Sequence, residues 1–270
     1  MATHTRLRTM IARLGALTIT LATVPAPGAE ARPEGAADHF AGSQIAKHEG
    51  PGRTARHRPR AGAAVPGMDV SSHQGDVDWA KAWADGARFA YVKATEGTGY
   101  RNPNFAQQYN GSHRVGMIRG AYHFALPDRS DGAAQAEFFA ANGGGWSPDG
   151  KTLPGAVDLE YNPYGDTCYG LSQAGMGAWV RAFSDRLVLR TGRHPTIYTS
   201  TSWWNRCVGE ADRFGATSPL WVAHYADQLG PLPHGWDYET IWQWRAAGRF
   251  PGDQNLFNGD DGQLRRVALG

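Results

Sequence analysis

The sequence predicts an α/β fold, namely a TIM-like β/α barrel with eight strands and an incomplete ring of helices on its last side. Apolar strand segments alternate with helical segments through the first two-thirds of the folded part, which is typical of parallel β/α units. The last third holds strand segments with little helix between them. With 270 residues, 41% of them hydrophobic, the chain can bury one sizeable core. We assign this barrel domain to residues 63–270.

The first 62 residues differ from the rest in composition. Residues 1–31 have the pattern of a secretory signal peptide: arginines, a short apolar run from Leu14 to Val24, and a small-residue cleavage site that ends at Ala31. An uncleaved membrane anchor is the alternative for this leader. Residues 32–62 are rich in Gly, Ala, Pro, Arg and His and have no apolar period, so we expect a disordered linker or a pro-segment.

The positive charge of the chain is concentrated in this leader. Residues 1–61 hold nine Lys/Arg and four Asp/Glu, although the net charge of the whole chain is only +2. The folded part is therefore acidic, which argues against nucleic acid as a partner. We expect a secreted, extracellular protein that has no membrane attachment after signal removal and is a monomer.

The first predicted β/α unit follows residue 63. Residues 65–70 form a short apolar strand. A helix over residues 77–84 is favoured by Asp78 in its first turn, and Gly86 ends it. The next strand covers residues 88–94, where apolar and β-branched residues dominate.

Two further helices alternate with one strand. The helix over residues 104–115 begins next to Pro103 and ends at Gly116. Residues 118–125 form a strand. The helix over residues 132–141 ends in a run of three glycines.

A central strand is predicted over residues 153–161, where Pro154-Gly155 marks its start and Asn162-Pro163 ends it. A long amphipathic helix over residues 172–191 follows, with Ser172 as its N-cap. Residues 194–199 form a strand, and residues 202–206 a short helical turn.

The last third contains strand segments in close succession. They cover residues 219–225, 240–244 and 254–257, and a short helix over residues 263–268 ends the chain. Little helix separates them, so one side of the barrel lacks its outer layer.

The central strand carries two acids, Asp158 and Glu160. A spacing of two puts their side chains on the same face, with Cα atoms roughly 6.5–7 Å apart. Carboxyl ends of barrel strands are where this fold keeps its chemistry. Neighbouring carboxylates repel, so the pKa of one should rise, and such an acid can protonate a glycosidic oxygen. The alternative is an ordinary strand end whose acids are solvated or paired with arginine.

Other polar groups stand at predicted carboxyl ends, which a parallel barrel brings to one face. The full set is Asp69, Lys93, Tyr122, His123, Asp158, Glu160, Tyr198, His224, Tyr225, Gln243 and Asp253. We expect His123 and His224 to be hydrogen-bonded structural groups. All ten Trp lie in the folded part, where most should pack in the core and some can stack on sugar rings.

The chain has two cysteines, Cys168 and Cys207, and both fall in predicted loops. In a secreted protein an even count favours a disulfide, which would join two barrel loops. A pair of free thiols is the alternative. A metal site is less favoured because no C-x-x-C or paired-His spacing accompanies them.

Five sequence blocks stand in a fixed order along the chain: residues 67–75 (GMDVSSHQG), 89–97 (FAYVKATEG), 118–124 (IRGAYHF), 158–160 (DLE) and 253–258 (DQNLFN). This order resembles that of glycoside hydrolase family 25, the Chalaropsis-type lysozymes, and the chain is similar to the secreted actinomycete muramidases of that family. The resemblance covers about residues 65–260. The chain departs from the usual pattern at Ser71–His73, where most members have an aromatic residue.

The resemblance implies hydrolysis of the β-1,4 bond between N-acetylmuramic acid and N-acetylglucosamine in peptidoglycan. It implies Glu160 as proton donor, Asp158 as second carboxylate, and Asp69 and Asp253 as further acids of the site. It also implies that Cys168 and Cys207 form the single disulfide of the actinomycete members. Candidate substrate-binding residues are Lys93, Tyr122, Tyr198 and Gln243. Neither a metal nor a cofactor is expected.

Two mechanisms are compatible with these acids. In the favoured one, Glu160 protonates the leaving oxygen while Asp158 orients the 2-acetamido group of the substrate, whose carbonyl attacks the anomeric carbon. The alternative is inversion, with Asp69 or Asp158 activating water.

A wall-binding lectin without turnover is the alternative to an enzyme that hydrolyses peptidoglycan. The complete set of acids favours the enzyme, because a protein that only binds need not keep it. A chitin-active enzyme would carry the signature D-x-x-D-x-D-x-E, which is missing, and no G-x-S-x-G elbow is present.

Overall fold

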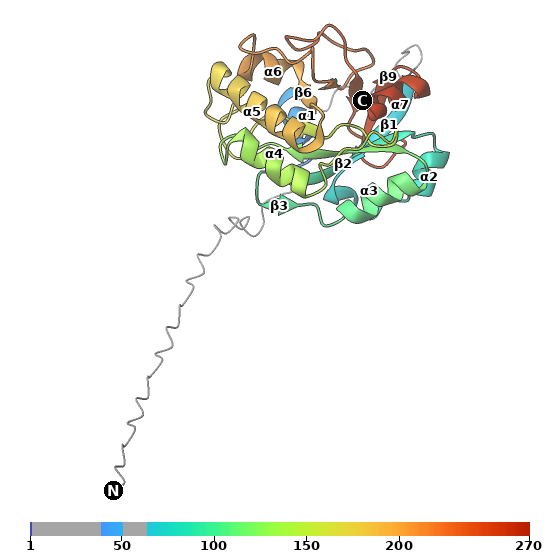
Figure 1. The fold of residues 1–270 in the computed structure, drawn as a ribbon. Helices are drawn as coiled ribbons and strands as arrows, with labels where there is room; N and C mark the ends of the chain where they lie inside the picture. The colour runs from blue at the N-terminus through green and yellow to red at the C-terminus, as the bar shows by residue number, and fades with distance from the viewer. Residues whose placement is uncertain (2–38, 51–63) are drawn as a thin grey trace.

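The computed structural model describes Met1, residues 39–50 and residues 64–270. In the order of hydrogen-bonded neighbours, the barrel strands are β1 (Ala64–Val70), β9 (Asp253–Asn258), β8 (Ile241–Arg245), β7 (Leu220–Ala223), β6 (Thr196–Ser200), β5 (Ala156–Asp158), β4 (Ile118–Phe124) and β2 (Phe89–Glu96). Strand β1 also pairs with β2, which closes the sheet. The predicted eight-stranded β/α barrel is therefore confirmed (Figure 1). A two-residue strand, β3 (Tyr100–Arg101), adds an antiparallel hairpin to β2.

One barrel strand runs against the others. Strand β9 is antiparallel to both β1 and β8, whereas the remaining neighbours pair in parallel. The prediction that Asp253 stands at the carboxyl end of a parallel strand is therefore wrong. Asp253 is the first residue of β9, and the reversal of this strand brings its amino end beside the carboxyl ends of its neighbours.

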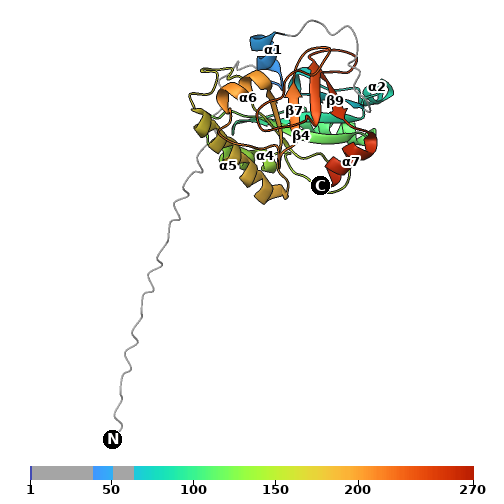
Figure 2. The same cartoon turned by 90° about the horizontal axis from the view of Figure 1, so that it is seen from above.

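Helices surround the strands on most sides (Figure 2). They are α1 (Ser43–Glu49), α2 (Trp79–Ala84), α3 (Phe105–Arg114), α4 (Gly132–Ala141), α5 (Gln173–Thr191), α6 (Thr201–Cys207) and α7 (Asp261–Leu269), with one 3₁₀ turn, η1 (Ser72–Gln74). Helices α4 and α5 pack against each other. Between β7 and β9 the described chain contains no helix, which confirms the predicted gap in the ring.

The predicted helix starts are explained by side-chain caps. Asp78 accepts a hydrogen bond from the Lys81 N–H at 2.9 Å, and Ser172 accepts one from the Gly175 N–H at 3.2 Å. Each cap satisfies a backbone donor that the helix leaves unpaired and stabilises its helix by about 1 kcal/mol.

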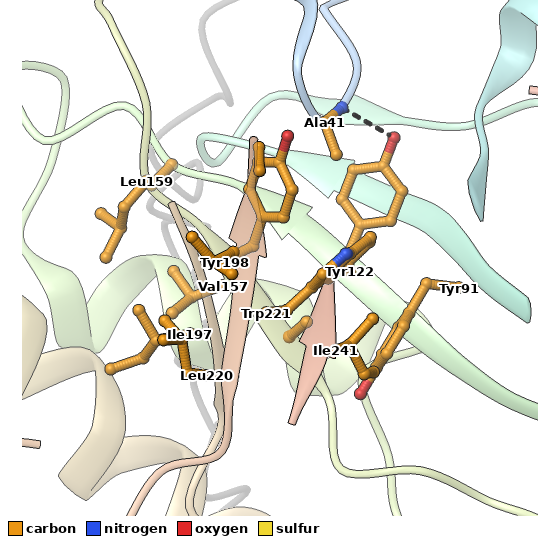
Figure 3. Packing of buried hydrophobic residues seen from close by; sticks show 14 of the residues in the cluster. Ala41, Tyr91, Tyr122, Val157, Leu159, Ile197, Tyr198, Leu220, Trp221 and Ile241 are labelled. Atoms are coloured by element: carbon orange, nitrogen blue, oxygen red, sulfur yellow. Dashed lines mark hydrogen bonds between the residues drawn. The ribbon is translucent and has the colours of Figure 1, made fainter. Parts of the chain in front are cut away.

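Large aromatic side chains fill the barrel interior (Figure 3). Trp221 of β7 stacks on Tyr91 of β2 with ring centroids 4.7 Å apart, and Tyr198 of β6 meets it edge-on at 4.6 Å. All three are at most 1% exposed. The Trp221 N–H donates to Asn255 Oδ1 at 2.8 Å, so this ring joins the core to the polar end of the barrel.

The central strand is shorter than predicted. Regular pairing in β5 covers only Ala156–Asp158, although the sequence predicts a strand over residues 153–161. The Leu159 N–H still donates to the Tyr198 carbonyl at 2.9 Å, so the chain continues along β6 for one residue. Beyond that point it leaves the ladder and carries Glu160 over the barrel end.

Part of the N-terminal region is ordered against expectation. Residues 39–50 lie within the stretch predicted to be a disordered linker or pro-segment, yet they form a turn and helix α1. The rest of that stretch up to residue 62, and residues 2–31 of the predicted signal peptide, lie outside the described residues. Within the described ranges, no helix is long and apolar enough to cross a membrane.

Cys168 and Cys207 form a disulfide, with Cα atoms 5.3 Å apart. Cys168 lies in the loop between β5 and α5, and Cys207 is the last residue of α6. The predicted disulfide is confirmed, although Cys207 lies in a helix and not in a loop as predicted.

Candidate active site

Four carboxyl groups gather at one end of the barrel. Asp69 is on β1, Asp158 ends β5, Glu160 follows two residues later, and Asp253 begins β9. None of them is more than 3% exposed. Buried carboxyl groups are costly unless they are protonated or hydrogen-bonded, so the partners of each one decide what it can do.

Asp69 is held by two amide side chains. Asn255 and Gln243 each donate a hydrogen bond to its Oδ2 atom, at 2.6 and 3.0 Å. Burial raises the pKa of Asp69 to about 7, and these two hydrogen bonds act in the opposite direction. The group can therefore carry charge near neutral pH in a fixed orientation.

Asp253 stands directly opposite Asp69 in the β1–β9 ladder. Its Oδ2 atom accepts no hydrogen bond within the described residues. Burial, followed by the charges of Asp69 and Glu160, raises the pKa of Asp253 well above its usual value. The preceding Gly252, with φ of 74°, brings the backbone against Asp69, because a Cβ there would lie 2.0 Å from the Asp69 carbonyl oxygen.

Asp158 has no hydrogen-bond donor on either carboxyl oxygen in the described part of the chain. Its pKa lies well above the usual range because of burial, then the charge of Glu160, while the charge of Lys93 acts in the opposite direction. The Asp158 carboxyl group interacts with that of Glu160 but accepts no N–H group of the described residues, so it is suited to receive one from a bound substrate.

Glu160 accepts three backbone hydrogen bonds from the segment before the barrel. The Gly42 N–H donates to Oε1, and the Gln44 and Ile45 N–H groups donate to Oε2, each at 2.8 Å. Burial raises the pKa of Glu160 to about 8, although these three donors lower it. Asp158 and Glu160 therefore come together in one buried pair, as their spacing predicts.

Lys93 supplies the positive charge beside the acids. Its ammonium forms an ion pair with Glu96 at 2.7 Å and lies 4.7 Å from the ring centre of Tyr100. Lys93 is fully buried and Glu96 is 3% exposed. The Lys93 ammonium also donates a hydrogen bond to the His39 carbonyl.

The predicted substrate-binding residues Tyr198 and Gln243 belong to one hydrogen-bond network. The hydroxyl groups of Tyr198 and Tyr225 donate to Gln243 Oε1 at 2.7 and 2.8 Å. Gln243 in turn donates to Asp69. The Tyr122 hydroxyl faces the same end of the barrel and accepts a hydrogen bond from the Ala41 N–H at 3.3 Å (Figure 3).

The two histidines of the predicted set lie outside this network. His123 is buried between Thr95 and Gln135, which contact its ring nitrogens at 2.7 and 2.9 Å. Burial lowers the pKa of His123 to about 4, so it is neutral near pH 7. This confirms its structural role. His224 is exposed after β7.

Sequence reasoning missed Glu96 and Asn255 as members of the site. Asn255 is two residues after Asp253, and the strand period alone places both on one face. Glu96 is three residues after Lys93, a spacing that puts two side chains on opposite faces of a regular strand. A register shift between Lys93 and Thr95 in β2 interrupts the regular alternation, so the side chains of Lys93 and Glu96 come to the same face.

Comparison with known proteins decides the family. The family model described as "Glycosyl hydrolases family 25" matches residues 68–253, which include all four acids. This chain belongs to glycosyl hydrolases family 25. It is a glycoside hydrolase, and the predicted resemblance is confirmed.

Among the described residues, no group of three His, Cys, Asp or Glu has an arrangement that could hold a metal ion.

Relatives in family 25 match the barrel closely. An N,O-diacetylmuramidase from Chalaropsis sp is 50% identical over 210 residues, which are 76% of this chain and all of the relative. Lysozyme M1 from Streptomyces globisporus is 44% identical over 250 residues, covering 90% of this chain and 85% of the relative. A family GH25 lysozyme structure from Aspergillus fumigatus superposes with a TM-score of 0.75 at 48% identity, over 77% of this chain and all of that one. The family match begins at Met68, so helix α1 lies before it.

Proposed function

We propose that this protein is a lysozyme, an N-acetylmuramidase that hydrolyses the β-1,4 bond between N-acetylmuramic acid and N-acetylglucosamine in peptidoglycan. The observation that carries the proposal is the buried pair of Asp158 and Glu160, which lies beside Asp69 and Asp253 at the carboxyl end of a family 25 barrel. The printed names of its relatives, lysozyme and N,O-diacetylmuramidase, support the same substrate class.

Glu160 is the general acid of this proposal. Burial raises the pKa of Glu160 to about 8 in this structure. A glycan chain that covers the same carboxyl group would likewise favour the protonated form, which can give its proton to the oxygen of the leaving sugar. The bond between the anomeric carbon and that oxygen then breaks, and the carboxylate that remains can take a proton from water in the second step.

Asp158 assists the substrate's own acetamido group. Its two oxygens accept no hydrogen bond from the described residues, so they can receive the acetamido N–H. That contact turns the acetamido carbonyl oxygen toward the anomeric carbon, where it forms the new bond and an oxazolinium-like ring. Water then adds to the anomeric carbon, its proton goes to Glu160, and the ring opens with retained configuration.

The remaining polar residues orient the sugar. Asp69, fixed by Asn255 and Gln243, and its neighbour Asp253 set the negative charge of the site. Candidate sugar contacts are Lys93, Tyr122, Tyr198 and Gln243. Each step uses only these side chains, the acetamido group and water, so the mechanism requires neither a metal nor a cofactor.

The protein acts outside the cell in this proposal. Its leader has the composition of a signal peptide, and its two cysteines form a disulfide, a bond that persists mainly in oxidising compartments. Peptidoglycan is found there as the substrate.

The test is release of muramic acid reducing ends from purified cell walls, measured together with loss of turbidity. Replacing Glu160→Gln should lower the rate by about 10²–10⁴, because the general acid is removed while its shape is kept. Binding to walls without release would favour the wall-binding lectin. Proton NMR of the first product separates the two mechanisms, because inverted configuration excludes the acetamido-assisted route.

A further inference from the structure

The segment of residues 39–50, which we call the N-terminal plug, covers the catalytic acids. It comprises the turn before α1, helix α1 itself and Gly50. With the N-terminal plug in place, Glu160 and Asp158 are both 0% exposed. A general acid must reach the glycosidic oxygen at hydrogen-bond distance, about 2.6–3.2 Å. A sugar chain cannot approach Glu160 in this arrangement.

The contacts of the N-terminal plug use the atoms that catalysis needs. Both oxygens of Glu160 accept backbone N–H groups of the plug, so neither is free to face a substrate. Helix α1 has no side-chain cap of its own. The Glu160 carboxyl group takes that place, since its oxygen Oε2 accepts the N–H groups of Gln44 and Ile45 at the helix start.

Further contacts of the N-terminal plug fall on the predicted sugar-binding residues. Lys93 donates to the His39 carbonyl, Gln243 donates to the Ala41 carbonyl at 3.2 Å, and Tyr122 accepts the Ala41 N–H. Three of the four candidate sugar contacts are thus occupied by main-chain atoms. Such atoms offer the same kinds of donor and acceptor as sugar hydroxyl and acetamido groups.

The two ends of the N-terminal plug are fastened to opposite parts of the barrel mouth. The Phe40 ring meets the ring of His73, a residue of η1, edge-on at 4.8 Å. At the other end, the His48 ring stacks on Tyr161 at 4.3 Å, and Glu49 accepts hydrogen bonds from Tyr161 and Ser200. The plug therefore spans the whole sugar-binding face.

We infer that the N-terminal plug is an inhibitory segment, which binds the sugar-binding face of its own barrel and must be released before the enzyme can bind a glycan chain. This inference rests on the proposed function for its natural substrate. The plug lies before the family match that begins at Met68, and the Aspergillus fumigatus structure is covered completely by 77% of this chain. The catalytic barrel therefore has relatives that are complete without a segment of this length.

Release can follow two routes: displacement by a glycan chain that competes for the same atoms, or a cut in the chain after the plug. A cut would leave the plug held only by its non-covalent contacts, and a glycan chain could then displace it more easily.

The test compares full chains that differ only in the plug. Gly42 has φ of 92°, and a Cβ at this position would lie 1.9 Å from the Tyr225 hydroxyl oxygen, so Gly42→Val cannot keep the bound geometry. Ile45→Asp is a second variant, since it buries a charge where Ile45 is 1% exposed. Lys47→Ala is the matched control, because Lys47 is exposed on the same helix.

Two readouts are measured on each protein: the rate of reducing-end release from walls and the affinity for a soluble peptidoglycan glycan, followed by tryptophan fluorescence. In Gly42→Val and Ile45→Asp, the rate of reducing-end release and the affinity for the glycan should each rise by about tenfold or more, because the plug no longer competes for the site. Both values should stay at the wild-type level in Lys47→Ala. Circular dichroism confirms that the barrel is folded.

A third protein separates displacement from cleavage. It carries the recognition sequence of a site-specific protease in place of residues 54–60, and its activity and affinity are measured before cleavage and after removal of the plug. Both should rise on removal, and a synthetic peptide of residues 39–50 should lower them again.

The outcomes distinguish the two proposals. Tighter glycan binding by the variants without turnover in any form would reject the lysozyme activity and keep the inhibitory plug. Lower activity and affinity in Gly42→Val and Ile45→Asp, or no improvement of either readout in any form, would overturn the inference, because the plug would then be a working part of the site or irrelevant to it.

Discussion

Asp69 and Asp253 face each other directly across the antiparallel pair of β1 and β9. Two like charges at opposite positions of a ladder destabilise a sheet, and this pair is also buried. The barrel tolerates the pair because Asn255 and Gln243 hydrogen-bond to Asp69 while Asp253 has a pKa raised well above its usual value. The pair of Asp69 and Asp253 therefore lowers the stability of the fold while it supplies two acids to the site.

The pH dependence of stability should show this conflict. The folded pKa of Asp69 is about 7 against a reference of 3.8, so between these values the folded state holds a proton that the unfolded state has lost. The contribution of Asp69 to stability should therefore be greatest below about pH 4 and fall as the pH rises toward 7. Asp69→Asn should flatten this fall by up to about 4 kcal/mol in urea unfolding at several pH values. If the free energy of unfolding of Asp69→Asn changes with pH in the same way as that of the wild type, the raised pKa of Asp69 is contradicted.

Asn255 should position Asp69 for catalysis. Asn255→Ala removes a donor to Asp69 and the acceptor of the Trp221 N–H. An unsatisfied buried Trp221 N–H should cost about 1–3 kcal/mol of stability. The pKa of Asp69 should rise further, so the acid limb of the activity profile should move to higher pH. Asn258→Ala, on the far end of the same strand, is the control, and an unmoved acid limb in Asn255→Ala would argue against the positioning role.

The buried ion pair of Lys93 and Glu96 should be sensitive to loss of one partner. Lys93→Met leaves the Glu96 charge buried and should destabilise the protein by about 3–5 kcal/mol in urea unfolding. Adding Glu96→Gln to this variant should restore part of the loss. Lys81→Ala removes the exposed pair with Asp85, and this control should cost far less stability than Lys93→Met, because solvent screens the pair. Equal losses in Lys93→Met and Lys81→Ala would show that burial of the pair is unimportant.

The disulfide should stabilise the barrel through the loop that it closes. Cys168 and Cys207 are 39 residues apart, and the chain-entropy relation gives about 4 kcal/mol for a loop of this length. Replacing both by Ser should lower the free energy of unfolding by about this amount. Reducing agent should lower the stability of the wild type in the same way and leave the double variant unchanged. A response of the double variant to reductant would point to another cause.

The acid cluster could be predicted because it depends on local rules. A spacing of two on a strand places Asp158 and Glu160 on one face, and the end of a barrel strand is the usual place for catalytic groups. The direction of β9 could not be predicted from its own sequence, since a strand pattern is the same in both directions. Asp253 therefore lies beside Asp69 at the expected end of the barrel, although it begins its strand and does not end it.

The N-terminal plug could not be predicted for a different physical reason. The seven residues of α1 are too few for a stable isolated helix, and the surrounding composition indicates disorder. The helix forms because Glu160, 115 or more positions away, accepts its first N–H groups. Glu96 was missed in a similar way, because the irregularity in β2 that turns it toward Lys93 has no local signature.

The reversal of β9 also gives the two chain ends different surroundings. Because β9 runs away from the acids, helix α7 and the C-terminus come to the opposite end of the barrel, where Gly270 lies against Trp146 in the loop that leads into β5 (Figure 2). The N-terminal plug, by contrast, lies against Glu160 at the end of the barrel that carries the acids. A wall-anchoring module or an immobilisation tag joined to Gly270 would thus leave the sugar-binding face accessible.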